Sequence, residues 1–184
     1  MKLRIVSGTL SRRYITVDKS SQGFRPTQER VRRAVADALR ERIPGAAAAD
    51  FCAGSGAFGI ELISRGAASV DFVESDRRRA SAISRMCGEL GITNKCRVFT
   101  KDIRNFPATC DKFYDVIFFD PPYEDTALAE LVPDLCKRLS KGGMLVYERE
   151  KSSVSQGDKL SPAEYDVEVR NYGDTAVEFI TKVL

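Results

Sequence analysis

The sequence predicts an α/β fold with a doubly wound, mixed but mainly parallel sheet. Three observations lead to this prediction. Short apolar runs alternate with helical patterns from residue 46 onward. A glycine-rich turn, Gly54-Ser55-Gly56-Ala57-Phe58-Gly59, follows the first of these runs. A tight turn at 171–174 joins the last two runs, which are therefore expected to form an antiparallel hairpin at the sheet edge.

The individual elements follow from apolar spacing and from turn residues. A small N-terminal β-hairpin, 3–7 and 13–17, precedes a helix from 27 to about 42 with Thr27 as its N-cap. Sheet strands are expected at 46–51, 69–74, 96–100, 113–119, 144–148, 165–169 and 176–181. The alanines of the first are weak strand formers, and that strand is assigned only because the glycine turn follows it. Helices are expected at 58–65, 77–90 and 126–139, where Pro133 must kink or split the last and Gly142-Gly143 must end it.

Composition excludes several classes of function. The 184-residue chain contains no histidine, which excludes an imidazole base and a histidine metal ligand. Its five cysteines form no CxxC pair, which argues against a disulfide framework and against a zinc site, so we expect no metal. No apolar run is long enough to span a bilayer and no signal peptide is evident. We therefore expect a cytoplasmic monomer without a membrane partner.

Positive charge is concentrated in the N-terminal segment. Residues 1–42 carry eleven Lys and Arg against four Asp and Glu, whereas residues 43–184 carry eighteen against twenty-two. Arg30, Arg33 and Arg40 gather on one face of the first expected helix, where they are free to contact phosphates. This imbalance favours contact with a polyanion such as a nucleic acid, although a solvated helix face would have the same pattern.

The glycine turn predicts a site for a cofactor with a nucleoside end. Glycines permit a tight turn and let the backbone approach a ligand at a helix N-terminus. Glu74 ends the next strand, twenty residues after Gly54, where its carboxylate can accept both hydroxyls of a ribose. On this pattern alone the cofactor is either NAD(P) or S-adenosylmethionine.

Further acidic residues favour S-adenosylmethionine. Asp50 precedes Gly54 by four residues, the layout of the methyltransferase turn, and Asp102 follows the third strand, where it can accept from an adenine amino group or cap a helix. A dehydrogenase would need a proton donor, and a chain without histidine offers few. Cys52 also fits a buried small residue without a redox role. The candidate cofactor-binding residues are Asp50, Cys52, Ala53, Gly54, Ser55, Gly56, Glu74, Ser75, Asp102 and Ile103.

Asp120-Pro121-Pro122-Tyr123 ends the expected strand 113–119 and is the most informative motif in the chain. The prolines lack N–H donors, so the corner is rigid and rich in acceptors. An exocyclic amine is a poor nucleophile because its lone pair is delocalised into the ring. Hydrogen bonds to the Asp120 carboxylate and the Pro121 carbonyl would localise that lone pair, and stacking of the base on Tyr123 is worth roughly 1–3 kcal/mol. The candidate catalytic residues are therefore Asp120, Pro121, Pro122 and Tyr123; a purely structural turn is the alternative.

These motifs resemble those of known proteins. The glycine turn with the Asp-Pro-Pro-Tyr corner resembles the Rossmann-like class I S-adenosylmethionine-dependent methyltransferases that act on exocyclic amines of bases. Segments 3–8, 24–32, 64–70, 74–77 and 172–176 are similar to the RsmD family of small-subunit (16S) rRNA guanine-N2 methyltransferases. The likeness covers nearly the whole chain.

The resemblance implies S-adenosylmethionine as cofactor and 16S rRNA or the small ribosomal subunit as partner. It implies an N-terminal hairpin and RNA-facing loop over 1–26 and a class I methyltransferase domain over 27–184. Further RNA contacts would be Arg4, Arg12, Arg13, Arg25 and Thr27. Other functions remain open: a DNA adenine-N6 methyltransferase, which would normally carry an added segment for reading duplex sequence, a glutamine-amide methyltransferase acting on protein, or a non-catalytic RNA-binding ribosome-assembly factor.

Overall fold

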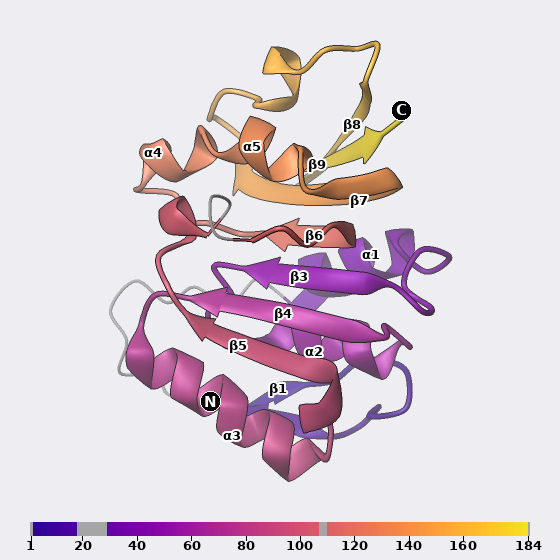
Figure 1. Cartoon of the computed structure of the whole chain (residues 1–184), viewed down its shortest axis with the longest axis vertical. Coiled ribbons are helices and arrows are strands. Elements are labelled where there is room, and N and C mark those ends of the chain that lie inside the picture. Colours follow the sequence, from indigo (N-terminus) through magenta and orange to yellow (C-terminus); the bar gives the residue numbers. More distant parts are fainter. Residues whose placement is uncertain (1, 18–28, 107–109, 184) are drawn as a thin grey trace.

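The computed structural model of the protein describes residues 2–17, 29–106 and 110–183. A seven-stranded sheet forms its centre, in the order β5-β4-β3-β6-β7-β9-β8 (Figure 1). The parallel strands are β3 (Ala47–Phe51), β4 (Ser69–Glu74), β5 (Cys96–Thr100), β6 (Tyr114–Phe119) and β7 (Leu139–Glu150). The antiparallel strands are β9 (Thr175–Lys182), which pairs with β7, and β8 (Tyr165–Tyr172) at the edge. The predicted mixed sheet and its closing hairpin are confirmed.

Hydrophobic cores lie on both faces of this sheet. One face is covered by α1 (Glu29–Ala38), α2 (Ala57–Ser64), α3 (Arg77–Leu90) and the N-terminal hairpin. The other face is covered by α4 (Thr126–Ala129), α5 (Val132–Cys136) and the 3-10 helix η2 (Ile103–Asn105). Two further 3-10 helices, η1 (Thr93–Lys95) and η4 (Gly157–Lys159), lie in connections. Because both faces are covered, β6 is buried at every position except Asp115, which is partly exposed.

The N-terminal hairpin consists of β1 (Lys2–Arg4) and β2 (Tyr14–Thr16), and it packs on α2. The Glu61 carboxylate of α2 accepts hydrogen bonds from the N–H groups of Val6 (2.8 Å) and Ser7 (3.1 Å). Gly8 has a φ of +85°, and a Cβ there would lie 1.8 Å from the Ser64 carbonyl oxygen. Only glycine therefore permits this approach, which fixes the hairpin to the helix.

Two predicted helix boundaries differ from the structure. Helix α1 ends at Ala38, earlier than expected, and the N–H groups of Arg42 and Ile43 then donate to the Leu39 carbonyl in a turn. Its predicted N-cap, Thr27, lies outside the described residues. The helix expected over 126–139 ends at Cys136. Its predicted split is confirmed, because α4 and α5 are separate helices and Pro133 lies in the first turn of α5, where its missing N–H is tolerated.

The prediction that Gly142-Gly143 ends a helix was wrong, because both glycines lie within β7. The register passes from Tyr114 opposite Leu139 to Val116 opposite Met144, so the additional residues of β7 form a bulge. Gly142 has a φ of +74°, and a Cβ on Gly143 would lie 2.9 Å from the Tyr114 carbonyl oxygen. The two glycines therefore allow the backbone of β7 to adopt the bulge.

Candidate functional site

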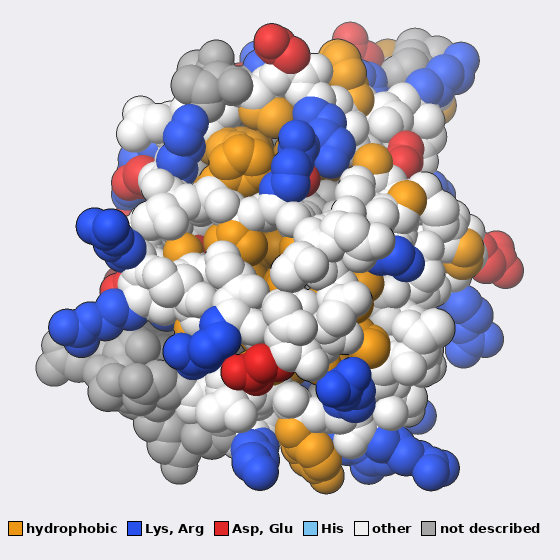
Figure 2. Space-filling model, turned by 60° about the horizontal axis from the view of Figure 1, so that its bottom comes forward, with side chains coloured by type: hydrophobic (Ala, Val, Ile, Leu, Met, Phe, Trp, Pro, Cys, Tyr) orange, Lys and Arg blue, Asp and Glu red, His pale blue; other side chains and the backbone are white. Residues whose placement is uncertain are grey.

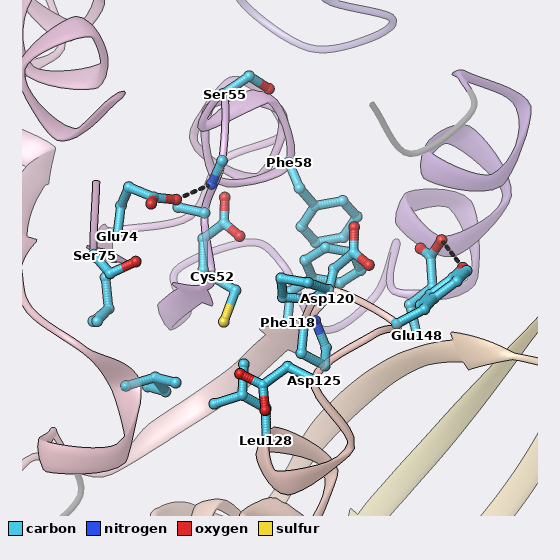
Figure 3. A pocket seen from close by; sticks show the side chains of 18 of the residues that line it. Cys52, Ser55, Phe58, Glu74, Ser75, Phe118, Asp120, Asp125, Leu128 and Glu148 are labelled. Atoms are coloured by element: carbon cyan, nitrogen blue, oxygen red, sulfur yellow. Dashed lines mark hydrogen bonds between the residues drawn. The ribbon is translucent and has the colours of Figure 1, made fainter. Parts of the chain in front are cut away.

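A cleft of about 870 Å³ opens at the carboxyl ends of β3, β4, β5, β6 and β7 (Figure 3). The parallel register pairs Phe51 with Phe119 and Phe119 with Tyr147, so Cys52, Asp120 and Glu148 follow at one level. The chain leaves the sheet after Phe51 and Phe119, while β7 continues to Glu150. All the candidate cofactor-binding and catalytic residues line this cleft except Gly56. Gly56 lies in the turn behind the lining, where its N–H donates to the Ala53 carbonyl (2.7 Å).

The glycine turn has an unusual backbone that is tied to β4. Cys52, Gly54 and Gly56 have φ values of 59°, 55° and 71°, in the left-handed region. This conformation is strained for Cys52, which carries a Cβ. The Ala53 N–H donates to the Val73 carbonyl (3.0 Å), and the Gly54 N–H donates to Glu74 Oε2 (2.7 Å). These bonds hold the turn against the end of the neighbouring strand.

Gly59, the last glycine of the turn, has a packing role and does not approach the cleft. A Cβ there would lie 2.3 Å from the Phe72 ring and 3.0 Å from Asp50 Oδ2. The Gly59 N–H donates to the same Asp50 oxygen (2.8 Å). Asp50 is buried, and desolvation raises its pKa even though the Gly59 N–H stabilises the charged form. Asp50 therefore joins the end of β3 to the first turn of α2.

This arrangement distinguishes between the two classes of cofactor. A free helix N-terminus attracts a pyrophosphate, but at α2 the Asp50 side chain already accepts from the backbone. The charges of Asp120 and Glu74 also act on Asp50, which raises its pKa further. A pyrophosphate would meet these acidic groups, whereas a sulfonium cation would be attracted to them. The residues present therefore fit S-adenosylmethionine better than a dinucleotide.

Glu74 lies at the cleft wall with both carboxylate oxygens in hydrogen bonds. Oε2 accepts from Gly54, and Oε1 accepts from the Asp76 N–H (2.8 Å) and lies 3.4 Å from Arg79 Nε. Each carboxylate oxygen has two acceptor sites, so Oε2, which has one partner, keeps a site for a ligand hydroxyl. This geometry supports the hypothesis that Glu74 accepts from a ribose.

Asp102 combines a cap with a place in the cleft lining. Its side chain accepts from the Arg104 N–H (2.9 Å) at the start of η2 and pairs with the Arg104 guanidinium (2.8 Å). The Arg104 backbone bond and guanidinium hold the pKa of Asp102 below its usual value. Arg104 also pairs with Asp125 across the rim. The alternative interpretation of Asp102 as a helix cap is thus confirmed, and Ile103 beside it is buried.

The Asp-Pro-Pro-Tyr motif forms a corner at the end of β6. The Asp120 N–H donates to the Phe51 carbonyl (3.5 Å), and the Pro122 carbonyl accepts from Asp125 (3.0 Å). The Tyr123 hydroxyl donates to Glu148 Oε1 (3.4 Å) and lies 3.3 Å from Thr175 Oγ1. Burial raises the pKa of Tyr123 to about 12, so the hydroxyl is neutral. The Tyr123 ring is therefore anchored at its far end to β7 and β9.

Sequence reasoning missed Glu148, a buried carboxyl group beside Asp120 (Figure 3). It lies at the carboxyl end of β7, and burial together with the charge of Asp120 raises its pKa to about 9. An acidic residue after the apolar run 144–147, on the strand that follows the Asp-Pro-Pro-Tyr motif, was the signal that could have found it.

An aromatic pair in the cleft lining was missed as well. Phe58 of α2 and Phe118 of β6 stack with ring centroids 3.8 Å apart and an interplanar angle of 17°. Figure 3 shows this pair next to Asp120, between the acids of the cofactor side and Glu148. The pair gives the cleft an apolar surface at its centre, which suits the flat face of a base.

The candidate RNA contacts that the structure describes come from the N-terminal hairpin and from α1. Arg4, Arg12, Arg13, Arg30 and Arg33 are exposed, while Arg25 and Thr27 lie outside the described residues. Arg13 donates to the Glu89 carbonyl (3.4 Å), and Arg33 lies 3.8 Å from Asp37. Figure 2 brings forward the face that carries the hairpin and α3, and it shows Lys and Arg side chains spread around this face.

Arg32 lies apart from these exposed arginines and was also missed. It is 2% exposed, donates to the Arg4 carbonyl (3.0 Å) and lines the cleft beside Leu3. Desolvation lowers its pKa, and the charge of Glu61 opposes this shift. A buried arginine thus joins α1 and β1 at the cleft wall.

Within the described part of the chain, no group of three or more Cys, Asp or Glu side chains is arranged to hold a metal ion. No helix in that part has both the length and the apolar character needed to cross a bilayer.

Comparison with known proteins agrees with this geometry. A family model described as "Conserved hypothetical protein 95" matches residues 3–181. The chain is 32% identical to "Ribosomal RNA small subunit methyltransferase D" of Buchnera aphidicola subsp. Acyrthosiphon pisum, over 82% of this chain and 79% of the relative. It is 31% identical to the protein of the same name from Escherichia coli (strain K12), over 90% of this chain and 82% of the relative.

A solved structure shares the whole fold. "Putative methyltransferase yhhF from Escherichia coli" superposes with a TM-score of 0.85 at 26% identity, over 100% of this chain and 99% of the other. The similarity thus covers the hairpin, the sheet and both layers of helices.

Proposed function

The chain belongs to the Conserved hypothetical protein 95 family, that of ribosomal RNA small subunit methyltransferase D, and on this premise we propose that it methylates the N2 amine of a guanine in 16S rRNA. The methyl donor is S-adenosylmethionine. One observation carries the proposal: the Asp-Pro-Pro-Tyr corner and the glycine turn with Glu74 line a single cleft.

The cofactor side of the cleft is formed by the ends of β3, β4 and β5. Glu74 would accept from the ribose hydroxyls, and Asp102 with Ile103 would contact the adenine. The turn 52–56 would lie against the remainder of the cofactor. S-adenosylmethionine supplies an electrophilic methyl group on a sulfonium, and the acidic residues around Asp50 favour that cation.

The base would occupy the other side of the cleft, between Asp120 and the aromatic pair. The Asp120 carboxylate and the Pro121 carbonyl would accept the two amine hydrogens, which localises the nitrogen lone pair and points it at the methyl carbon. Tyr123, anchored through its hydroxyl, would stack on the base. Positioning for in-line attack accounts for much of the rate, because no strong base is needed to remove a proton from the methylated amine.

The target guanine must leave its helix to reach this corner. A base inside a duplex cannot enter a cleft, so the substrate is single-stranded or the nucleotide is flipped out. The N-terminal segment 1–26 would face the RNA, with Arg4, Arg12, Arg13, Arg30 and Arg33 on phosphates and with Arg25 and Thr27 as further contacts. Such phosphate contacts fix the position of the RNA and carry no base specificity.

The proposal is tested by locating the methyl group. Small ribosomal subunits from cells that lack this modification are incubated with the protein and with S-adenosylmethionine labelled in its methyl group. Mass spectrometry of nuclease fragments should then find one N2-methylguanine in 16S rRNA. Labelling of adenine N6, or labelling of DNA in place of the subunit, would contradict the proposal.

A further inference from the structure

We propose that Glu148 reads the target base: its carboxyl group donates a hydrogen bond to the acceptor ring nitrogen beside the reacting amine, which in guanine is N3 and not the protonated N1. This assignment rests on the proposed function, since it concerns the base held by Asp120. It gives a role in substrate recognition to a residue outside the Asp-Pro-Pro-Tyr motif.

Glu148 lies at the same level of the sheet as Asp120. Strands β6 and β7 are parallel neighbours, and Phe119 is paired with Tyr147, so Asp120 and Glu148 follow at the same level. Figure 3 shows the two carboxyl groups beside each other in the cleft. A base whose amine contacts Asp120 therefore places an adjacent ring atom near Glu148.

One carboxyl oxygen of Glu148 has no hydrogen-bond partner among the described residues. The residue is only 4% exposed, and Oε1 accepts from Tyr123 at 3.4 Å. Oε2 is buried and has no hydrogen-bond partner among the described residues. A buried polar atom without a partner loses its hydrogen bonds to water and is destabilising. A ligand atom at this position would remove that destabilisation.

The charge state of Glu148 identifies the kind of ligand atom. Burial and the neighbouring Asp120 raise the pKa of Glu148 to about 9, so the group is neutral at pH 7. Because Oε1 accepts from Tyr123, the proton belongs on Oε2, which then acts as a donor. Other titratable groups in the lining of the whole cleft include Asp50, Glu150, Asp174 and, from α1, Arg32.

Asp120 and Glu148 together match the edge of guanine that carries N2. The amine is a donor and faces the acceptor Asp120, while N3, on the sugar edge, is an acceptor and faces the donor Glu148. N1, on the other side of the amine, carries a hydrogen and would meet Glu148 donor against donor, so the pair selects the sugar edge. Adenine and cytosine also have a ring nitrogen beside their amine, so this pair selects bases with an amine and rejects uracil. It also fixes the rotation of the base, which directs the amine toward the methyl carbon.

Two variants of Glu148 test the assignment. Glu148→Gln keeps the shape and a neutral donor, whereas Glu148→Met keeps the approximate length and has no donor. Glu168→Gln is the matched control, because Glu168 is exposed on β8 and does not line the cleft. For each protein we would measure methyl transfer to unmodified small subunits, the dissociation constant of S-adenosylmethionine by calorimetry, and the melting temperature.

The expected rates and melting temperatures distinguish a role of Glu148 in base recognition from a role in the stability of the fold. Glu148→Gln should transfer methyl groups within about threefold of wild type, and Glu148→Met should be slower by at least tenfold, about 1.4 kcal/mol. Glu148→Met should melt near the wild-type temperature, because it removes the unsatisfied Oε2 and leaves the Tyr123 hydroxyl with Thr175 Oγ1 as its partner, and it should bind the cofactor normally. Tyr123→Phe, which keeps Glu148 and removes the hydroxyl, should be slowed less than Glu148→Met if the loss comes from the contact with the base. A structural role would instead lower the melting temperature and the rate together.

The results that would contradict the role of Glu148 differ from the result that would contradict the proposed function. If Glu148→Gln is as slow as Glu148→Met, a carboxylate charge is required and the assignment is wrong. If Glu148→Met equals wild type, or loses activity only because it is destabilised, Glu148 does not read the base. A wild-type protein that binds S-adenosylmethionine without methylating rRNA would overturn the proposed function, and this assignment with it.

Discussion

Glu148 lies beside Asp120 at the carboxyl ends of two neighbouring parallel strands, and this proximity together with burial keeps Glu148 protonated at neutral pH. A neutral carboxyl group can donate a hydrogen bond, so this corner holds a donor next to Asp120. Glu148 is 4% exposed, whereas Asp120 is only partly buried.

Replacing Glu148 with glutamine should make folding stability less dependent on pH. The pKa of Glu148 is about 9 in the folded protein and about 4.3 in an unfolded chain. Between these values the folded state binds the additional proton, so this group lowers wild-type stability as pH rises toward 9. Thermal unfolding at about pH 5, 7 and 9 should show the stability advantage of Glu148→Gln widening with pH. Other groups, including Asp50 and Tyr123, are common to both proteins, so a constant difference would contradict the raised pKa.

Glu74→Ala should weaken cofactor binding. The substitution removes the proposed ribose acceptor and also leaves the Gly54 and Asp76 N–H groups without their acceptor. Hydrogen bonds to a charged group contribute about 1.5–3 kcal/mol, so the dissociation constant for S-adenosylmethionine should rise by at least tenfold in calorimetry. Glu89→Ala, at an exposed position in α3, is the control and should bind normally. Equal affinity in both variants would exclude a contact between Glu74 and the cofactor.

Gly59→Ala should destabilise the protein, whereas Gly88→Ala should not. A Cβ on Gly59 would overlap the Phe72 ring, while a Cβ on Gly88 in α3 meets no atom within 4 Å. Overpacking costs about 1–3 kcal/mol, and alanine in an exposed helix position gains about 0.4–1 kcal/mol. Denaturant unfolding should therefore move the two midpoints in opposite directions. A stable Gly59→Ala protein would show that the contact between α2 and β4 adapts easily.

Arg30→Gln should weaken RNA binding and reduce its salt dependence. If Arg30 contacts a phosphate, its loss lowers the slope of log affinity against log salt by about one. Arg170→Gln on β8 is the control, because Arg170 pairs with Glu168 at the far edge of the sheet. Filter binding of a 16S rRNA fragment at several salt concentrations measures both slopes. An unchanged slope for Arg30→Gln would indicate a solvated helix face.

Sequence patterns were sufficient for the order of elements and for the main motifs. Apolar runs bounded by turn residues located the strands, and the register then brought the glycine turn and Asp120 to one edge. Local patterns could not locate the bulge in β7, because Gly142-Gly143 followed by an apolar run is also typical of a helix end. That bulge depends on contact with the Tyr114 carbonyl, which is distant in sequence.

Local sequence patterns also identified only some of the residues that line the cleft. Asp50 and Glu74 were recognised by their spacing from Gly54, which is a local property. Glu148 and Arg32 were missed because their importance comes from burial between elements that are distant in the chain. A charged residue in a sequence is usually solvated, and only the packing shows that these two are not.

The most direct test of the central claim is the rate of methyl transfer by Asp120→Ala under single-turnover conditions, with the dissociation constant of S-adenosylmethionine measured in parallel. Removal of a group that stabilises the transition state should slow transfer by about 100-fold or more, while cofactor affinity stays within about twofold of wild type, below 1 kcal/mol. Transfer by this variant at the wild-type rate would contradict the assignment of Asp120, and with it the account of the cleft as the site of amine methylation.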